Sequence, residues 1–164
     1  MADKPGDGGA PLSNGEANHQ LIVNAQYVKD LSFENPRAPH SLMQQKDPPE
    51  VQIGVDVKAQ GLGQDIFEVV LTITAKALAG TETVFVVELA YAAVVTVRAT
   101  SQELLPVLLL VETPRLLFPF ARAVVGAATR EGGFPPLLLH PVDFAELLRR
   151  QQQTGAAAGV VATA

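Results

Sequence analysis

The 164-residue chain has no cysteine and no cluster of positive charge. Without cysteine, disulfides and thiolate metal sites are excluded. Its three histidines, His19, His40 and His140, are far apart and never spaced as a ligand pair, so we expect no metal site. The net charge of -5 argues against nucleic acid as a partner, because phosphate binding needs clustered Lys and Arg.

Long uncharged apolar runs are also missing. The most apolar stretch, residues 104–120, contains three prolines and two charged residues, Glu112 and Arg115, so we expect no membrane span. Residues 1–18 are rich in Gly, Asp, Pro and Asn and lack the apolar segment of a secretory signal. These features predict a soluble, cytoplasmic protein.

Signatures of catalysis are equally scarce. Ser, His and Asp residues are scattered, with no nucleophile elbow and no metal-ligand cluster. Gly61-Leu62-Gly63 is only a weak phosphate signal, because no helix start follows it. We expect no enzyme activity and no cofactor. An enzyme or small-ligand binder that uses a pocket between sheet and helices stays open as an alternative.

The length fits a single domain. Composition divides the chain into an N-terminal segment, 1–19, that we expect to be disordered, and a folded domain, 20–153. The remaining tail, 154–164, consists mainly of Ala, Gly, Val and Thr and is expected to be flexible.

Four runs of the folded domain predict strands. They lie at about 21–34, 51–58, 66–78 and 83–97, with a turn at 61–65 and a hairpin turn at 79–82. Strands in succession, followed by helices, predict the α+β class with an antiparallel sheet. We expect the face that carries Leu71 and Phe85 to be covered by the helices or by another subunit.

Helical periodicity begins after the fourth strand. Ser101 is a candidate cap for a short helical turn, and longer helices are expected at about 116–130 and 142–153. Pro119 lacks an N–H group, so we expect it in the first turn of its helix or at a kink.

The first strand carries two carboxylates on one face. Because successive side chains alternate, Asp30 and Glu34 point away from the apolar residues of the strand. Val86 and Glu88 share one face of the fourth strand. Acids on a solvated strand often do no more than solvate it. Three acids on one flat face would also attract a basic partner.

Four motifs follow one another along the chain: Tyr27–Pro39, Phe67–Leu71, Glu112–Arg122 and Gly132–Leu139. Together they resemble SecB, a family of bacterial export chaperones, and the resemblance covers roughly 21–152. The chain departs from the family at Ala93, often a glycine there, and at Val95, often a phenylalanine. Both changes affect packing or substrate contact near the end of the fourth strand.

The resemblance implies a homotetramer, a dimer of dimers. Each subunit would be a four-stranded antiparallel sheet with a long and a short helix packed by subunit association. It implies an ATP-independent chaperone that binds unfolded precursor proteins, keeps them translocation-competent and delivers them to the SecA ATPase. SecA docking is implied at Asp30, Glu34, Val86 and Glu88.

Two further sets of residues are candidate contacts. The proline-rich segment 134–139 presents apolar groups at low entropic cost, which suits a groove for extended, unfolded segments. The candidate groove residues, for which core burial is the alternative, are Leu42, Met43, Phe134, Leu137, Leu138, Phe144 and Leu147. The candidate subunit interface, for which core is again the alternative, is Leu116, Phe120, Ala123, Val124 and Ala127.

A second function is compatible with the same resemblance. A SecB-like fold can also serve a toxin–antitoxin pair, and the residues of the chain do not discriminate between that role and general export.

Overall fold

A computed structural model describes residues 19–43, 47–155 and 160–163 of the chain. The segment expected to be disordered lies outside the described residues, except for His19. Residues 156–159 and 164 of the tail also lie outside them.

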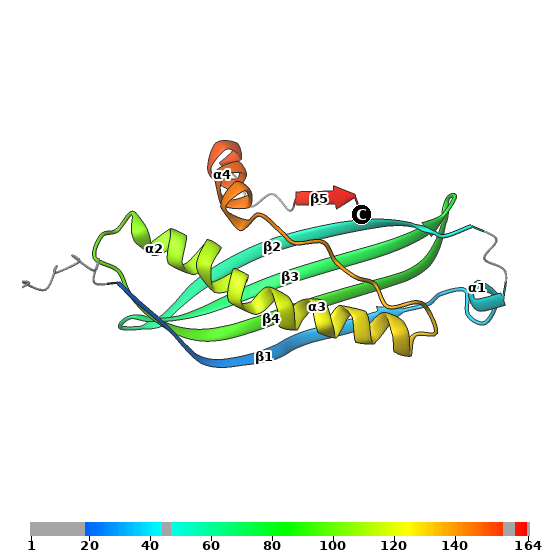
Figure 1. The fold of residues 1–164 in the computed structure, drawn as a ribbon, viewed down its shortest axis with the longest axis horizontal. Coiled ribbons are helices and arrows are strands. Elements are labelled where there is room, and N and C mark those ends of the chain that lie inside the picture. The colour runs from blue at the N-terminus through cyan, green and yellow to red at the C-terminus, as the bar shows by residue number, and fades with distance from the viewer. Residues whose placement is uncertain (1–18, 44–46, 156–159, 164) are drawn as a thin grey trace, which may run out of the picture.

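An antiparallel sheet forms the body of the chain (Figure 1). β1 (Gln20–Glu34), β4 (Glu82–Arg98), β3 (Ile66–Ala79) and β2 (Glu50–Gly63) lie side by side in that order, and β5 (Val160–Thr163) pairs with the outer edge of β2. Every neighbouring pair is antiparallel, which confirms the predicted class. The last long strand therefore lies between the first and the third.

The connections between strands are tighter than the sequence indicated. Only Gln64 and Asp65 form the turn between β2 and β3, and Asp65 adopts a left-handed conformation with φ of 57°. The glycines expected in that turn, Gly61 and Gly63, belong to β2 instead. The predicted hairpin turn is confirmed at Gly80 and Thr81, where Gly80 has φ of 62°.

The helical part begins earlier than predicted. It runs from α2 (Leu104–Val107) through a five-residue π-helical segment, η1 (Leu108–Glu112), into α3 (Thr113–Glu131). The expected start of the longer helix at about residue 116 was wrong. Pro119 lies inside α3 and not in a first turn, and the alternative of a kink at Pro119 stays a prediction. Pro114 lies at the start of α3, directly after the π-helical segment.

Two short elements complete the fold. α1 (His40–Met43) is a single turn after β1, and α4 (Phe144–Thr154) follows the proline-rich segment. The side chain of Asp143 accepts a hydrogen bond of 3.0 Å from the Glu146 amide and caps α4. The Ser101 hydroxyl accepts a hydrogen bond of 3.3 Å from the Leu104 amide, but Glu103 occupies the N-cap position of α2, so the prediction of Ser101 as the cap was wrong in position.

One face of the sheet packs against α3. Leu71, Ile73 and Val87 on this face are completely buried, and Phe85 is 4% exposed. Leu117, Ala121 and Val125 of α3 are completely buried as well. The prediction that helices cover the face of Leu71 and Phe85 is therefore confirmed (Figure 1).

The continuous helix formed by α2, η1 and α3 is long and strongly apolar. By length and composition alone, Leu104–Glu131 is apolar enough to cross a membrane, although the charges at Glu112 and Arg115 argued against a span. Its buried residues line the face that packs on the sheet, as expected of a helix in a protein core.

Candidate functional site

The four residues expected to bind a partner come together on the sheet face away from α3. β1 and β4 are paired so that Glu34 lies opposite Val86 and Ser32 lies opposite Glu88. Facing residues of an antiparallel pair have Cβ atoms about 5 Å apart. Asp30, Glu34, Val86 and Glu88 thus form one continuous patch, which we call the acidic face.

The acidic face is open to solvent. Asp30, Glu34 and Glu88 are exposed and Val86 is partly buried. Among the described residues, no cation forms an ion pair with any of the three carboxylates. Lys76 of β3 lies next to Val86 on the same face and is exposed. The patch therefore has a net negative charge that internal pairing does not cancel.

A second group of polar residues on this sheet face was not predicted. The Tyr27 hydroxyl donates a hydrogen bond of 2.5 Å to Glu68 Oε1, and Lys29 Nζ lies 2.8 Å from both Glu68 oxygens. We call these three residues the bridge. Tyr27, Lys29 and Glu68 all lie inside motifs that carry the family resemblance, but their pairing depends on the strand order.

The bridge shifts the proton affinity of two of its members. Hydrogen bonds from Lys29 and Tyr27 hold the pKa of Glu68 below its ordinary value. The hydrogen bond to Glu68, with a further contribution from burial, raises the pKa of Tyr27. Both shifts favour the same state, a carboxylate that accepts from a protonated phenol and an ammonium group.

At the end of the sheet near α1, three aromatic rings form a cluster. The ring centroids of Phe33, Phe85 and Phe134 lie 4.9 to 6.3 Å apart. Gly132 sits against the Phe33 ring so closely that a Cβ atom would overlap it. Gly133, with φ of 89°, similarly contacts Leu42 of α1. The two glycines thus let the turn after α3 close onto β1 and α1.

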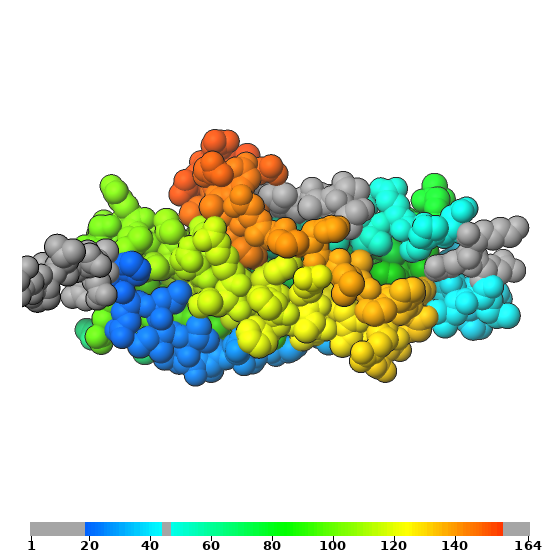
Figure 2. Space-filling view, viewed as in Figure 1, coloured from blue at the N-terminus to red at the C-terminus, as the bar shows by residue number. Residues whose placement is uncertain are grey.

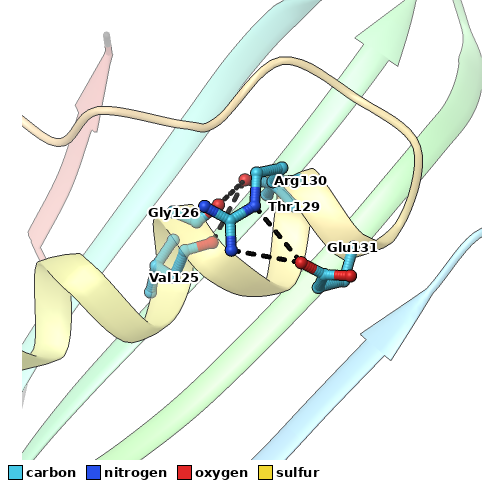
Figure 3. A network of polar contacts seen from close by, with 5 residues as sticks. All are labelled: Val125, Gly126, Thr129, Arg130 and Glu131. Carbon is cyan, nitrogen blue, oxygen red and sulfur yellow. Dashed lines mark hydrogen bonds and ion pairs between the residues drawn. The ribbon is translucent and has the colours of Figure 1, made fainter.

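The proline-rich segment after this cluster is fixed to α3 through Thr129, whose contacts within α3 appear in Figure 3. The Thr129 hydroxyl donates toward the carbonyl groups of Val125 and Gly126, at 3.1 and 3.0 Å. The same oxygen accepts a hydrogen bond of 2.9 Å from the Leu137 amide. Thr129 is completely buried, so its hydroxyl positions the segment without contact with water.

The candidate groove residues do not form a single surface. Phe134, Phe144 and Leu147 are buried in the core, where the Phe144 ring meets Phe118 edge-on at 6.0 Å. Leu42, Met43 and Leu138 are 48%, 76% and 65% exposed, and Leu137 is partly buried. α1, which carries Leu42 and Met43, lies at the right-hand end of the molecule in Figure 1, well away from α4.

The candidate interface residues lie on the outward side of α3. Leu116 and Phe120 are 51% and 50% exposed, Ala123 is exposed, and Val124 and Ala127 are partly buried. On the helix side of β1, Val28 and Leu31 are also exposed. Figure 2 shows α3, in yellow, uncovered beside β1, in blue.

Within the described ranges, no three His, Cys, Asp or Glu residues are close enough together to hold a metal ion. The bridge combines shifted pKa values of Glu68 and Tyr27 with a network of hydrogen bonds. It lies on an open sheet face and has no nucleophile beside it.

Comparison with known proteins gives a consistent result. The SecB family, described as preprotein translocase subunit SecB, matches residues 14–155. Proteins called protein-export protein SecB are 54% identical in Rhodospirillum centenum, over 80% of this chain and 79% of that protein, and 48% identical in Nitrobacter hamburgensis, over 93% and 94%. The Maricaulis maris protein of that name is 48% identical over 96% of this chain and 91% of its own length.

A solved structure has a similar fold. A SecB-like chaperone of Mycobacterium tuberculosis, in complex with a peptide from an antitoxin, superposes with a TM-score of 0.57 at 16% identity. The match covers 74% of this chain and 90% of that one. At this identity the likeness concerns the fold alone.

Proposed function

We propose, since this chain belongs to the SecB family of protein-export chaperones, that it binds unfolded preproteins without ATP and delivers them to the SecA ATPase. Members of this family are chaperones, and the chain is accordingly not an enzyme. Export takes place from the cytoplasm, and we place the protein there.

The observation that carries the proposed SecA contact is the acidic face. Strand pairing brings Asp30, Glu34, Val86 and Glu88 into one exposed patch. Unpaired carboxylates on a flat surface speed the encounter with a basic partner and select against acidic ones. Val86 adds a partly buried apolar side chain among the charges.

Preprotein binding is supported by exposed apolar residues of α1 and of the proline-rich segment after α3. Leu42, Met43 and Leu138 expose much of their surface to water, and Leu42 packs beside Gly133. An unfolded chain would bury these groups together with its own apolar side chains. Such contacts do not require a particular sequence, so one surface can serve many preproteins.

Assembly into a homotetramer is supported by the outward side of α3. A helix that already buries one face against the sheet still exposes Leu116 and Phe120, and β1 exposes Val28 and Leu31 beside it. Apolar surface of this kind on two neighbouring elements indicates a contact with another subunit.

The experiment for SecA docking replaces the three carboxylates of the acidic face. The triple variant Asp30→Ala, Glu34→Ala, Glu88→Ala is expected to bind SecA at least about tenfold more weakly. Its binding of an unfolded preprotein should not change. The matched control removes three exposed carboxylates outside β1 and β4, with Asp47→Ala, Glu103→Ala and Glu131→Ala. If both triple variants bind SecA as the wild type does, the docking proposal is wrong.

The toxin–antitoxin role is the weaker alternative. It has support only from the fold of a protein that is 16% identical, whereas the export proteins are 48% to 54% identical. We therefore favour export.

A further inference from the structure

The bridge connects two strands that do not pair with each other. Tyr27 and Lys29 belong to β1 and Glu68 belongs to β3, and β4 lies between these strands. Adjacent strands are about 4.8 Å apart, so the bridge spans roughly twice that distance. The bridge crosses β4 on the side of the sheet away from α3, the same side as the acidic face.

A small residue of β4 leaves room for the crossing. Ala92 pairs with Tyr27 on one side and with Val70 on the other, so it lies below the path of the bridge. The Ala92 side chain is completely buried, although α3 covers the opposite face of the sheet. The long side chains of Tyr27, Lys29 and Glu68 explain this burial.

The bridge also determines where one positive charge is placed. The register of β1 against β4 shifts between Val28 and Asp30, and Lys29 lies at this irregularity, directly before Asp30. The Lys29 side chain is 48% exposed, whereas that of Glu68 is 13% exposed. Without Glu68, the ammonium group would be free to approach the carboxylate of Asp30.

The net charge of this side of the sheet is small, so the position of the Lys29 ammonium group changes it substantially. Asp30, Glu34 and Glu88 are unpaired carboxylates, and Lys76 is an exposed cation without an ion-pair partner among the described residues. Asp56 and Lys58 on β2 compensate each other at 3.8 Å. By alternation along β2, the exposed Glu50 is a fourth carboxylate of this face without an ion pair among the described residues. An additional free Lys29 would therefore cancel about a third of the negative charge that remains after Lys76.

We propose that the bridge holds the ammonium group of Lys29 against Glu68 and so keeps this positive charge away from the carboxylates of the acidic face. The acidic face therefore stays negative toward a basic partner. This inference rests on the proposed SecA contact and extends it to three residues that do not themselves need to touch the partner. Glu68 is the positioning residue, because it neutralises Lys29 and accepts from Tyr27.

The test compares two single charge removals that should have opposite effects. In the full-length chain, Glu68→Gln releases Lys29 and is expected to slow association with SecA about two- to fivefold at low salt. Lys29→Gln leaves Glu68 as an additional carboxylate, so association should be as fast as in the wild type or faster. The double variant removes both charges and should restore the wild-type rate.

Salt dependence gives a second measure from the same experiment. Added salt screens charges, so the differences between variants should shrink as ionic strength rises. If Glu68→Gln and Lys29→Gln both slow association, and the double variant is slower still, the bridge supports the sheet and does not place charge. If none of the variants differs from the wild type, the proposal is also wrong.

Binding of an oligolysine peptide tests the bridge independently of whether SecA is the partner. The peptide is a basic ligand with no structure of its own, so it measures only the charge of the face. If it shows the opposite effects of Glu68→Gln and Lys29→Gln while SecA does not bind the wild type, the bridge residues set the charge of the face and SecA is the wrong partner. If the wild type binds SecA and neither ligand shows the opposite effects, the bridge proposal alone fails.

Discussion

The carboxylate of Glu68 illustrates how one residue depends on the order of the strands. Its two donors come from β1, and it lies on β3. The sequence predicted which residues of β1 face solvent, because alternation alone determines that. It did not predict the bridge, because the contact exists only when β4 lies between β1 and β3.

The bridge predicts a dependence on pH at both ends of the scale. The pKa of Glu68 is lowered, so its contribution to stability is complete above the ordinary value of 4.5 and is lost as the pH falls through the lower folded value. The pKa of Tyr27 is raised, so the contribution of its phenol is complete below the ordinary value of 10.0 and is lost as the pH rises through the higher folded value.

Absorbance of the phenolate measures the alkaline part of this prediction. Because the chain has only two tyrosines, Tyr27→Phe assigns the titration of Tyr27 in the wild type. Glu68→Gln should move this titration to lower pH, since the phenol loses its charged acceptor. A midpoint that does not change in Glu68→Gln would show that Tyr27 and Glu68 do not interact in solution.

Gly132 is needed for its small size, not for its conformation. Its φ of -74° and ψ of 0° suit any residue, but a Cβ atom would overlap the ring of Phe33. Gly132→Ala is therefore expected to reduce the free energy of unfolding by about 1 to 3 kcal/mol, measured by urea denaturation.

A second substitution tests the cause. Phe33→Leu removes the ring that the methyl group would meet, so the double variant should lose less stability than the sum of the two single variants. Gly61→Ala is the matched control, because its Cβ atom would lie 3.9 Å from the nearest side-chain atom, an ordinary contact with Phe67. Strict additivity of Gly132→Ala and Phe33→Leu would contradict this explanation.

At the scale of the elements, strands were predicted better than helices. Alternation located all four long strands to within a few residues, apart from the part of β2 beyond residue 58. The long helix was predicted to begin at about residue 116, whereas the continuous helix begins at Leu104. Pro106 and Pro114 lack an N–H group and are unfavourable inside a helix. Packing on the sheet outweighs these local preferences, and buried Leu108, Leu109 and Val111 continue the apolar face.

Pro119 shows why its position could not be inferred locally. A proline inside a helix leaves the carbonyl of the residue four positions earlier without its usual donor, and here that residue is Arg115. Both Pro119 and Arg115 are exposed, so water can reach that carbonyl. The cost of an internal proline is smaller on the outward side of α3 than it would be in the core.

The proline-rich segment is expected to depend on one hydroxyl. Thr129→Val keeps the shape of the side chain but leaves the Leu137 amide without its acceptor, so the free energy of unfolding should fall by about 1 to 3 kcal/mol. Urea denaturation measures this loss, and Thr129→Ser should retain most of the stability. Thr72→Val on the open sheet face is the control, since within the described part of the chain the Thr72 hydroxyl forms no hydrogen bond. Equal stability of Thr129→Val and Thr72→Val would contradict the role of Thr129.

At the scale of the whole molecule, the outward side of α3 exposes large apolar side chains to solvent in the single chain. Substituting Leu116→Asp and Phe120→Asp places two charges where we expect a subunit contact, and the proposed tetramer should dissociate at micromolar concentration. Sedimentation measures the mass of the assembly. The subunit should stay folded by circular dichroism, because both side chains are half exposed in the single chain.

Leu62→Asp is the control for this experiment. Leu62 is 54% exposed near the end of β2, away from α3, so its substitution should leave the assembly intact. A wild-type chain that sediments as a monomer would contradict the proposed tetramer directly.

Assembly is also the level at which the sequence was least informative about the site. The residues of the acidic face could be selected from alternation and family resemblance, and strand pairing then confirmed that they are neighbours. Phe134, Phe144 and Leu147 were selected as groove residues by the same kind of argument, yet each is buried in the core of the single chain. Apolar residues near proline do not reveal from sequence alone whether they face the core or a client.

The measurement that tests the central claim most directly is suppression of aggregation in the absence of nucleotide. An unfolded preprotein is diluted from denaturant with an equal amount of the assembled chain, and light scattering is followed over time. We predict that scattering stays near the level of the buffer alone, because the chaperone covers the apolar surface of the preprotein as it is exposed. Aggregation at the same rate with and without the chain would contradict its function as an ATP-independent export chaperone.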